Sequence, residues 1–136
     1  MTHPPWRVAI VDDDRAYTEM VSDVLAEEGF EVLSFRNSAD ARRLLPAARP
    51  DLVILDLWLE HPGSGLALAT WLYEEPATRS IPLVICSGDT AQLRSNTRTT
   101  SLGTYTTLHK PFDLDELLDA VRRMLPSAPL LSGASY

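Results

Sequence analysis

The sequence predicts a doubly wound α/β fold, in which a five-stranded parallel sheet carries helices on both faces. Short apolar runs recur about every 20 to 30 residues, and each interval between them holds a helical pattern and two short loops. Two parallel strands need a long crossover connection, usually a helix, and these intervals are long enough to supply it. The alternation therefore favours parallel strands joined by helices over antiparallel hairpins.

The five predicted strands differ in how evenly apolar they are. They cover Val8–Val11, Val32–Phe35, Leu52–Leu55, Leu83–Cys86 and Tyr105–Leu108. The first, third and fourth strands are continuously apolar, as expected of strands that are covered on both faces. The second and fifth strands include polar residues and are expected at the edges, which gives the strand order 2-1-3-4-5.

Two helices are predicted in the first half of the chain. The first runs from about Asp14 to Glu28 and stops at Gly29. Its buried face is expected to consist of Met20, Val21, Val24 and Leu25. The second begins near Ser38, a candidate cap, and is expected to end before Pro46, because proline has no backbone N–H to donate.

Three more helices are predicted in the second half. One covers Gly65 to Glu75, and the next covers about 90–102, a segment rich in Thr, Ser and Asn with low helix propensity. The last begins with a capping box from Asp113 to Glu116, presents leucine and valine at helical spacing, and ends at Pro126. Residues 1–125 are therefore expected to form one domain, and residues 126–136 a flexible tail or the start of a linker.

The composition of the chain excludes several classes of function. The chain has 136 residues, of which 45% are hydrophobic, and a formal net charge of −7. The acidic excess argues against direct binding of nucleic acid, and the three histidines lack the spacing of a zinc site. The chain shows no secretion signal or spanning segment, and its lone Cys86 excludes an intramolecular disulfide, so we expect a cytoplasmic protein without membrane contact.

Polar side chains stand where the central strands end. Asp12 and Asp13 follow the first strand, Asp56 the third and Ser87 the fourth, and Lys110 with Pro111 follows the fifth. Because the carboxyl ends of parallel strands meet at one edge of the sheet, these groups are expected to converge on one crevice. Clustered carboxylates repel one another unless a cation joins them, and oxygen ligands suit Mg²⁺.

The chain resembles the receiver domains of bacterial two-component response regulators. The resemblance covers about residues 7–125 and rests on VDDD, VILDL, ICSG and HKPF in the right order and spacing. It implies the flavodoxin-like (βα)5 receiver fold, with Asp56 as the phosphoryl acceptor and Asp12 and Asp13 as the acidic pair that binds Mg²⁺.

Further roles follow from the same resemblance. It implies that the Trp58 backbone carbonyl completes the metal ligands with Asp56, that Ser87 and Lys110 contact the phosphoryl group, and that the Lys110–Pro111 peptide bond is cis. Trp58 and Asp89 are expected to flank the path of the water that hydrolyses the acyl phosphate. The protein would then be no enzyme in the usual sense, since it assists only its own phosphorylation and dephosphorylation.

Two features depart from the family pattern. The loop after the acceptor, DLWLEHPGSG, is one residue longer than the common form, with Pro62 and Gly65 six and nine positions beyond Asp56. Most receivers carry an aromatic residue three positions before the lysine, where this chain has Thr107. Tyr105 lies on the same side of the strand as Thr107 by strand alternation, so it is a candidate to substitute in part for that aromatic residue.

The leading hypothesis is a phosphorylation-dependent signalling module. Its expected partners are a sensor histidine kinase or a phosphotransfer protein and a downstream protein, and its expected state is a monomer or weak homodimer. The alternative is a receiver-like interaction module that works without phosphorylation, which Thr107 favours. An aspartate-nucleophile phosphatase is disfavoured because Trp58 stands where its second acid is expected, and flavin binding is disfavoured because no Ser/Thr-rich phosphate loop follows the first strand.

Overall fold

The computed structural model describes residues 5–88 and 104–125, and within them a parallel sheet forms the centre of the molecule. Its strands are β1 (Arg7–Val11), β2 (Glu31–Phe35), β3 (Leu52–Asp56), β4 (Leu83–Ser87) and β5 (Tyr105–His109). They pair in the order β2-β1-β3-β4-β5, and every pairing is parallel. The predicted order and the two edge strands are confirmed.

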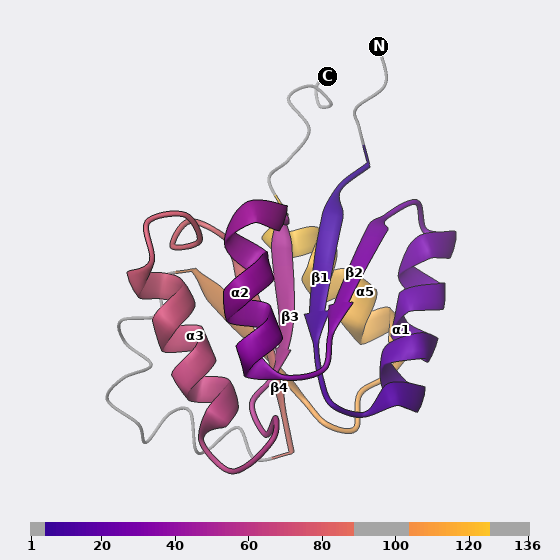
Figure 1. The fold of residues 1–136 in the computed structure, drawn as a ribbon. Coiled ribbons are helices and arrows are strands. Elements are labelled where there is room, and N and C mark those ends of the chain that lie inside the picture. The colour runs from indigo at the N-terminus through magenta and orange to yellow at the C-terminus, as the bar shows by residue number, and fades with distance from the viewer. Residues whose placement is uncertain (1–4, 89–103, 126–136) are drawn as a thin grey trace.

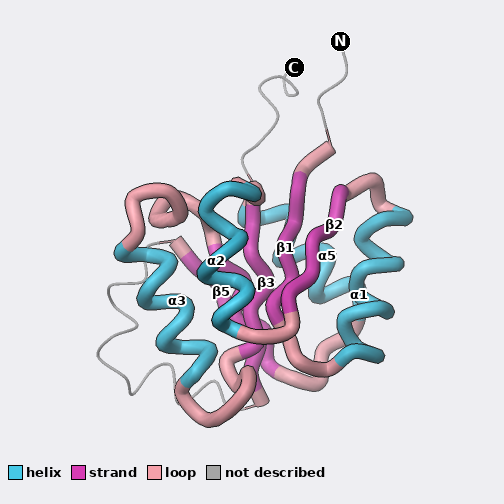
Figure 2. The backbone as a smooth tube through the Cα atoms, viewed as in Figure 1, coloured by secondary structure: helices cyan, strands magenta, loops and turns pink. Residues whose placement is uncertain are grey.

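The helices cover both faces of this sheet, as Figures 1 and 2 show. They are α1 (Arg15–Glu27), α2 (Ser38–Ala48), α3 (Ser64–Glu74) and α5 (Leu114–Met124). The helix predicted at about 90–102, Asp89 and the tail predicted at 126–136 lie outside the described residues. None of the helices that the described residues form has the length and apolar character needed to cross a bilayer.

Strand alternation divides the core into two layers. In β1, Ala9 and Val11 pack with α2 and α3, whereas Val8 and Ile10 pack with α1 and α5. The central strands β1, β3 and β4 are buried along almost their whole length, whereas β2 and β5 are partly exposed. Because burying apolar surface is the main favourable term in folding, the two layers fix the sheet and hence the edge at which its strands end.

Helix α1 differs from the prediction in the face that it buries. Met20 is 46% exposed, so its place in the inner stripe is wrong, whereas Val21 and Leu25 are buried as expected. The buried stripe instead includes Thr18, whose hydroxyl lies 3.5 Å from the Asp12 carbonyl oxygen and donates to it. A polar side chain that finds a backbone partner can take an inward position, which hydrophobic periodicity alone does not reveal.

Helix α2 also differs from the prediction at both ends. It continues through Pro46 to Ala48, and its cap is Asn37 rather than Ser38. Proline so close to the end of a helix removes only one internal hydrogen bond, and the Arg49 N–H closes the last turn by donating to the Leu45 carbonyl. Helix α5 keeps the predicted capping box of Asp113 and Glu116.

Gly65 sits where the third helix meets the end of β3. A Cβ at this position would lie 2.3 Å from the carbonyl oxygens of both Asp56 and Leu57. The Gly65 N–H donates to the Leu57 carbonyl at 3.1 Å, so the helix is held against the strand by close backbone contact. Any side chain here has to push α3 away from the strand that carries Asp56.

We expect Gly65→Ala to lower the free energy of unfolding by about 3 kcal/mol, because overpacking against fixed backbone has no flexible group that can yield. Gly88→Ala is the matched control, since a Cβ at Gly88 meets nothing within 4 Å. Urea denaturation of both variants measures the difference. Equal stability of the two variants would mean that the α3 contact is not tight.

Candidate functional site

Three carboxylates and an ammonium group meet at the carboxyl edge of the sheet. Oxygen atoms of Asp12, Asp13 and Asp56 all lie within 4.8 Å of one another. Asp12 and Asp56 are buried, at 2% and 7% exposed, whereas Asp13 is exposed. Lys110 Nζ lies 3.4 Å from Asp12 Oδ2 and 3.5 Å from Asp56 Oδ1. The structure thus brings together the acidic residues and the lysine that the sequence analysis singled out.

Backbone contacts fix the two buried carboxylates. The Asp14 N–H donates to Asp12 Oδ1 at 2.9 Å, and the Trp58 N–H donates to Asp56 Oδ1 at 3.2 Å. The Asp12 N–H in turn donates to the Phe35 carbonyl of β2. Asp12 directly follows β1 and Asp56 ends β3, so the positions of these two carboxylates are set by the sheet rather than by a long loop.

Ser87 and Lys110 are tied to each other through the backbone. Ser87 is the last residue of β4 and is 6% exposed. Its carbonyl accepts a hydrogen bond from the Lys110 N–H at 2.8 Å, and the peptide bond after Lys110 is cis, as predicted. The two loops that leave β4 and β5 therefore start from one shared contact beside Asp56.

Negative charge exceeds positive charge in the site. Burial raises the pKa of Asp56 to about 6, and the Asp12 charge adds to this rise, although Lys110 and the Trp58 N–H oppose it. Burial also raises the pKa of Asp12. Burial alone would lower the pKa of Lys110, but the Asp12 and Asp56 charges outweigh it and the pKa is raised. Two buried carboxylates thus share one ammonium, and Asp13 adds a third negative charge beside them.

This donor set fits a divalent cation such as Mg²⁺. Carboxylate oxygens are the ligands that Mg²⁺ prefers, and one exposed carboxylate leaves room for the waters that this ion retains. The charge of the site also fits a divalent cation, because the single positive charge of Lys110 does not neutralise the clustered carboxylates. The residues that would hold the ion are Asp12, Asp13 and Asp56, together with the Trp58 carbonyl that the family resemblance implies.

Metal-free protein should lose stability as the pH rises from about 4 to about 6. The folded pKa of Asp56, about 6, exceeds its ordinary value of 3.8, so the native state binds more protons in this range and ionisation destabilises it. The ionisation of Asp56 should lower the free energy of unfolding by about 3 kcal/mol at most, and Asp56→Asn should lack this contribution. Thermal unfolding in chelator across this pH range, with the exposed Asp23→Asn as control, measures it. Parallel curves for wild type and Asp56→Asn would contradict the assigned burial.

The loop after Asp56 is anchored at its midpoint by Glu60. One carboxylate oxygen of Glu60 accepts from the Ser38 N–H at 3.0 Å and from the Ser38 hydroxyl at 2.7 Å. Burial raises the pKa of Glu60, but the hydrogen bonds that its carboxylate accepts together outweigh burial, and the pKa is lowered. Glu60 thereby ties this loop to the start of α2, where its carboxylate satisfies the Ser38 N–H of the first turn.

Three residues that matter here were not identified as such from the sequence. They are Tyr17, whose ring lies under Lys110, Glu60, which anchors the loop, and Gly65, which packs under Asp56. Gly65 had a signal in its position nine residues beyond Asp56, but the close approach depends on how α3 meets β3. No sequence pattern marks the contacts of Tyr17 and Glu60, because their partners are far away along the chain.

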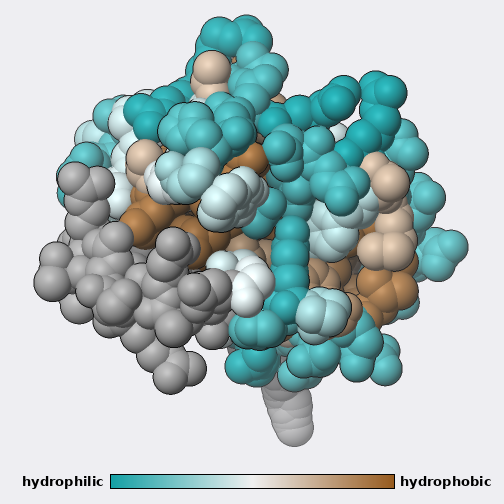
Figure 3. Space-filling model, turned by 90° about the horizontal axis from the view of Figure 1, so that it is seen from below, coloured by the Kyte–Doolittle hydropathy of each residue, from teal (hydrophilic) through white to brown (hydrophobic). Residues whose placement is uncertain are grey.

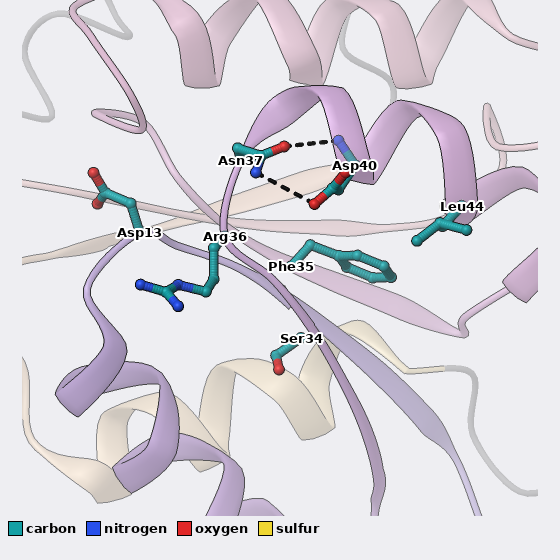
Figure 4. A pocket seen from close by; sticks show the side chains of 7 residues that line it. All are labelled: Asp13, Ser34, Phe35, Arg36, Asn37, Asp40 and Leu44. Carbon is teal, nitrogen blue, oxygen red and sulfur yellow. Dashed lines mark hydrogen bonds between the residues drawn. The ribbon is translucent and has the colours of Figure 1, made fainter.

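The surface around the site is polar, and apolar surface lies beside it. Figure 3 looks onto the carboxyl ends of the strands and shows a hydrophilic band with hydrophobic surface on both sides. A hollow of about 590 Å³ adjoins Asp13. In Figure 4, Asp13 and Arg36 stand at one end of this hollow and Leu44 at the other, while Asn37 and Asp40 hydrogen-bond to each other at its rim.

The structure also shows the surroundings of three other residues that the sequence analysis singled out, Trp58, Thr107 and Tyr105. Trp58 is 59% exposed beside Asp56. Thr107 is exposed on β5, whereas Tyr105 is partly buried against the core layer under α2 and α3. Tyr105 is therefore packed rather than free at the surface.

Comparison with known proteins gives consistent matches. A model of the response regulator receiver domain matches residues 8–122. Over 121 residues the chain is 28% identical to sporulation initiation phosphotransferase F of Bacillus subtilis, covering 88% of this chain and 94% of that protein. It is 32% identical over 124 residues to the phosphate regulon transcriptional regulatory protein PhoB of Rhizobium meliloti, covering 90% of this chain and 53% of that protein. The chain thus spans about half the length of the latter relative.

Among solved structures, the chain is similar to the receiver domain of sensor histidine kinase PA1611 from Pseudomonas aeruginosa. The TM-score is 0.77 at 21% sequence identity, and the match covers 88% of this chain and 97% of that one. That structure has a magnesium ion coordinated in its active site cleft. At this identity the likeness shows the fold alone.

Proposed function

The chain belongs to the response regulator receiver domain family, and we propose that it takes a phosphoryl group onto Asp56 from a histidine kinase or phosphotransfer protein. The observation that carries this proposal is the cluster itself: a buried carboxylate, two further carboxylates within 4.8 Å and a lysine 3.5 Å away. This arrangement offers a nucleophile, ligands for a divalent cation and a fixed positive charge in one place.

The chemistry is an in-line displacement at phosphorus. An oxygen of the Asp56 carboxylate forms a bond to phosphorus, and the bond from phosphorus to the donor's leaving atom breaks. Mg²⁺, when bound, supplies positive charge that offsets the phosphoryl oxygens. Lys110 supplies further positive charge there, and Ser87 is proposed to donate a hydrogen bond to a phosphoryl oxygen. The protein thus contributes positioning and electrostatic stabilisation.

The consequence for signalling follows from the charge that is added. Phosphorylation brings about −2 charge to the edge of the sheet, where Lys110 and Ser87 start the two loops after β5 and β4. Movement of either group toward the phosphoryl oxygens shifts the loop that it begins, and such shifts bias a pre-existing conformational equilibrium. A downstream protein that reads these loops would distinguish the two states.

The test of the proposal is phosphorylation by a small acyl or amido phosphate. Intact-mass spectrometry of the wild-type protein should show one phosphoryl adduct with Mg²⁺ and none in chelator. The competing function, an interaction module that works without phosphorylation, is favoured by Thr107 at the position of the usual aromatic residue. A wild-type protein that stays unmodified at saturating donor and Mg²⁺ would reject the proposal in favour of that module.

We also expect the phosphorylated form to be long-lived, because of Trp58. Its backbone N–H is bound to Asp56 Oδ1, so the indole starts directly beside the acceptor and, being large and apolar, should crowd the approach of water. Trp58→Asn should hasten loss of the phosphoryl group by about tenfold, equivalent to roughly 1.4 kcal/mol of barrier.

The decay of the phosphorylated mass peak after donor removal measures this effect. Trp58→Phe is the matched control, because it keeps an apolar ring at the same place and should decay at nearly the wild-type rate. Decay in Trp58→Asn that is equal to or slower than in the wild type would show that the indole does not exclude water.

A further inference from the structure

Lys110 is surrounded by three groups rather than two. Its Nζ lies 3.4 Å from Asp12 Oδ2 and 3.5 Å from Asp56 Oδ1, and it also stands over the ring of Tyr17, 4.7 Å from the ring centroid. A cation over the face of an aromatic ring within about 6 Å is attracted by the ring's quadrupole. The side chain of Lys110 is 31% exposed, so part of its hydration is already lost and the ring contact gains strength.

The Tyr17 ring is itself held in place. Tyr17 lies in the first turn of α1, where its N–H donates to the capping carboxylate of Asp14 at 3.1 Å. Its ring meets the Phe112 ring edge to face, with centroids 6.1 Å apart and planes at 77°. Phe112 follows Pro111 in the loop after β5, so the ring is fixed from the α1 side and from the side of the lysine loop.

A lysine needs such support when it must reach a transferred group. Its stem has four carbons and freely rotating bonds, and two carboxylates alone leave the ammonium free to move between them or out to solvent. A ring face adds a third, uncharged contact. That contact stays in place when the carboxylates bind other partners, because the ring does not take part in ligating a metal.

We propose that Tyr17 is a positioning residue, whose ring face holds the Lys110 ammonium beside Asp56 so that it meets the phosphoryl oxygens as the bond to phosphorus forms. This inference rests on the proposed function and adds a residue to it. Lys110 neither gives nor takes a proton in the step. Lys110 contributes positive charge at a fixed position, and Tyr17 contributes by holding the ammonium at that position.

The kinetic test compares Tyr17→Leu with Tyr17→Phe, in the wild-type and in the Lys110→Met background. The rate of adduct formation at saturating Mg²⁺ and small phosphoryl donor should fall about fivefold in Tyr17→Leu and stay near the wild-type rate in Tyr17→Phe. In the Lys110→Met background, which lacks the ammonium, Tyr17→Leu should have no further effect.

Each other result counts against the inference. An unchanged rate in Tyr17→Leu would show that the ring is not needed, and an equal loss in Tyr17→Phe would assign the effect to the hydroxyl. A loss that persists in the Lys110→Met background would show that Tyr17 acts through packing instead of through the lysine.

A second measurement does not depend on phosphoryl transfer. In nuclear magnetic resonance spectra, the ε-methylene protons of Lys110 should be shifted by the ring current in wild type and in Tyr17→Phe, and this shift should disappear in Tyr17→Leu. If the wild-type protein forms no adduct, the proposed function is overturned, and the contact between Tyr17 and Lys110 then has no role in phosphoryl transfer. A wild-type protein that forms the adduct but shows no ring-current shift overturns only the role of Tyr17.

Discussion

Asp56→Asn should form no phosphoryl adduct under conditions in which the wild-type protein is modified completely. An amide is uncharged, and its oxygen is a much weaker nucleophile than a carboxylate oxygen, whereas its shape is nearly the same. The variant should also fold, because Asn removes a buried charge whose pKa burial has raised to about 6. Loss of the adduct would therefore report on chemistry rather than on folding.

The matched control for this variant is Asp23→Asn, on the exposed side of α1. It makes the same chemical change away from the site and should leave the adduct unaffected. Both variants are compared with the wild type by intact-mass spectrometry in Mg²⁺ buffer. An adduct that survives in Asp56→Asn would assign the acceptor to another residue.

Asp13→Ala should weaken Mg²⁺ binding more than the roughly 10- to 100-fold that loss of a supporting outer-shell group typically costs. Asp13 is the exposed member of the three clustered carboxylates, and the variant removes this proposed direct ligand while leaving Asp12 and Asp56 in place. A Mg²⁺ titration followed by tryptophan fluorescence is suitable, because the exposed indole of Trp58 lies beside the acceptor.

Asp14→Ser is the control for this effect. Asp14 is the neighbouring carboxylate, but it caps α1 by accepting from the Tyr17 N–H, and serine keeps that capacity without the charge. Its Mg²⁺ affinity should remain within a few-fold of the wild type. Equal losses in the two variants would mean that Asp13 contributes general negative charge and is no ligand.

The sequence predicted the sheet and the meeting point of its functional groups because both depend on simple periodicity. Continuous apolar runs indicated β1, β3 and β4, and the carboxyl ends of parallel strands have to meet at one edge. Asp12, Asp56 and Lys110 were therefore placed together without knowledge of any distance. The strand order followed from the polar residues in β2 and β5.

Features that depend on contacts between distant segments were not predictable in this way. Thr18 lies inward with its hydroxyl bonded to a backbone acceptor, while Met20 is exposed. Helix α2 passes Pro46 because only one hydrogen bond is lost there. The ring of Tyr17 under Lys110 joins residues that are 93 positions apart in the chain. Such contacts are set by how helices and loops pack on the sheet, and a single sequence carries no periodic signal for them.

The most direct test of the account locates the phosphoryl group in the wild-type protein. After modification by a small phosphoryl donor with Mg²⁺, borohydride reduces an aspartyl phosphate to homoserine, and peptide mass spectrometry then identifies the residue. The account predicts homoserine at position 56 and at no other aspartate, with none formed when Mg²⁺ is chelated. Homoserine at a different position, or a phosphoryl group that resists borohydride because it is an ester on Ser87, would contradict it.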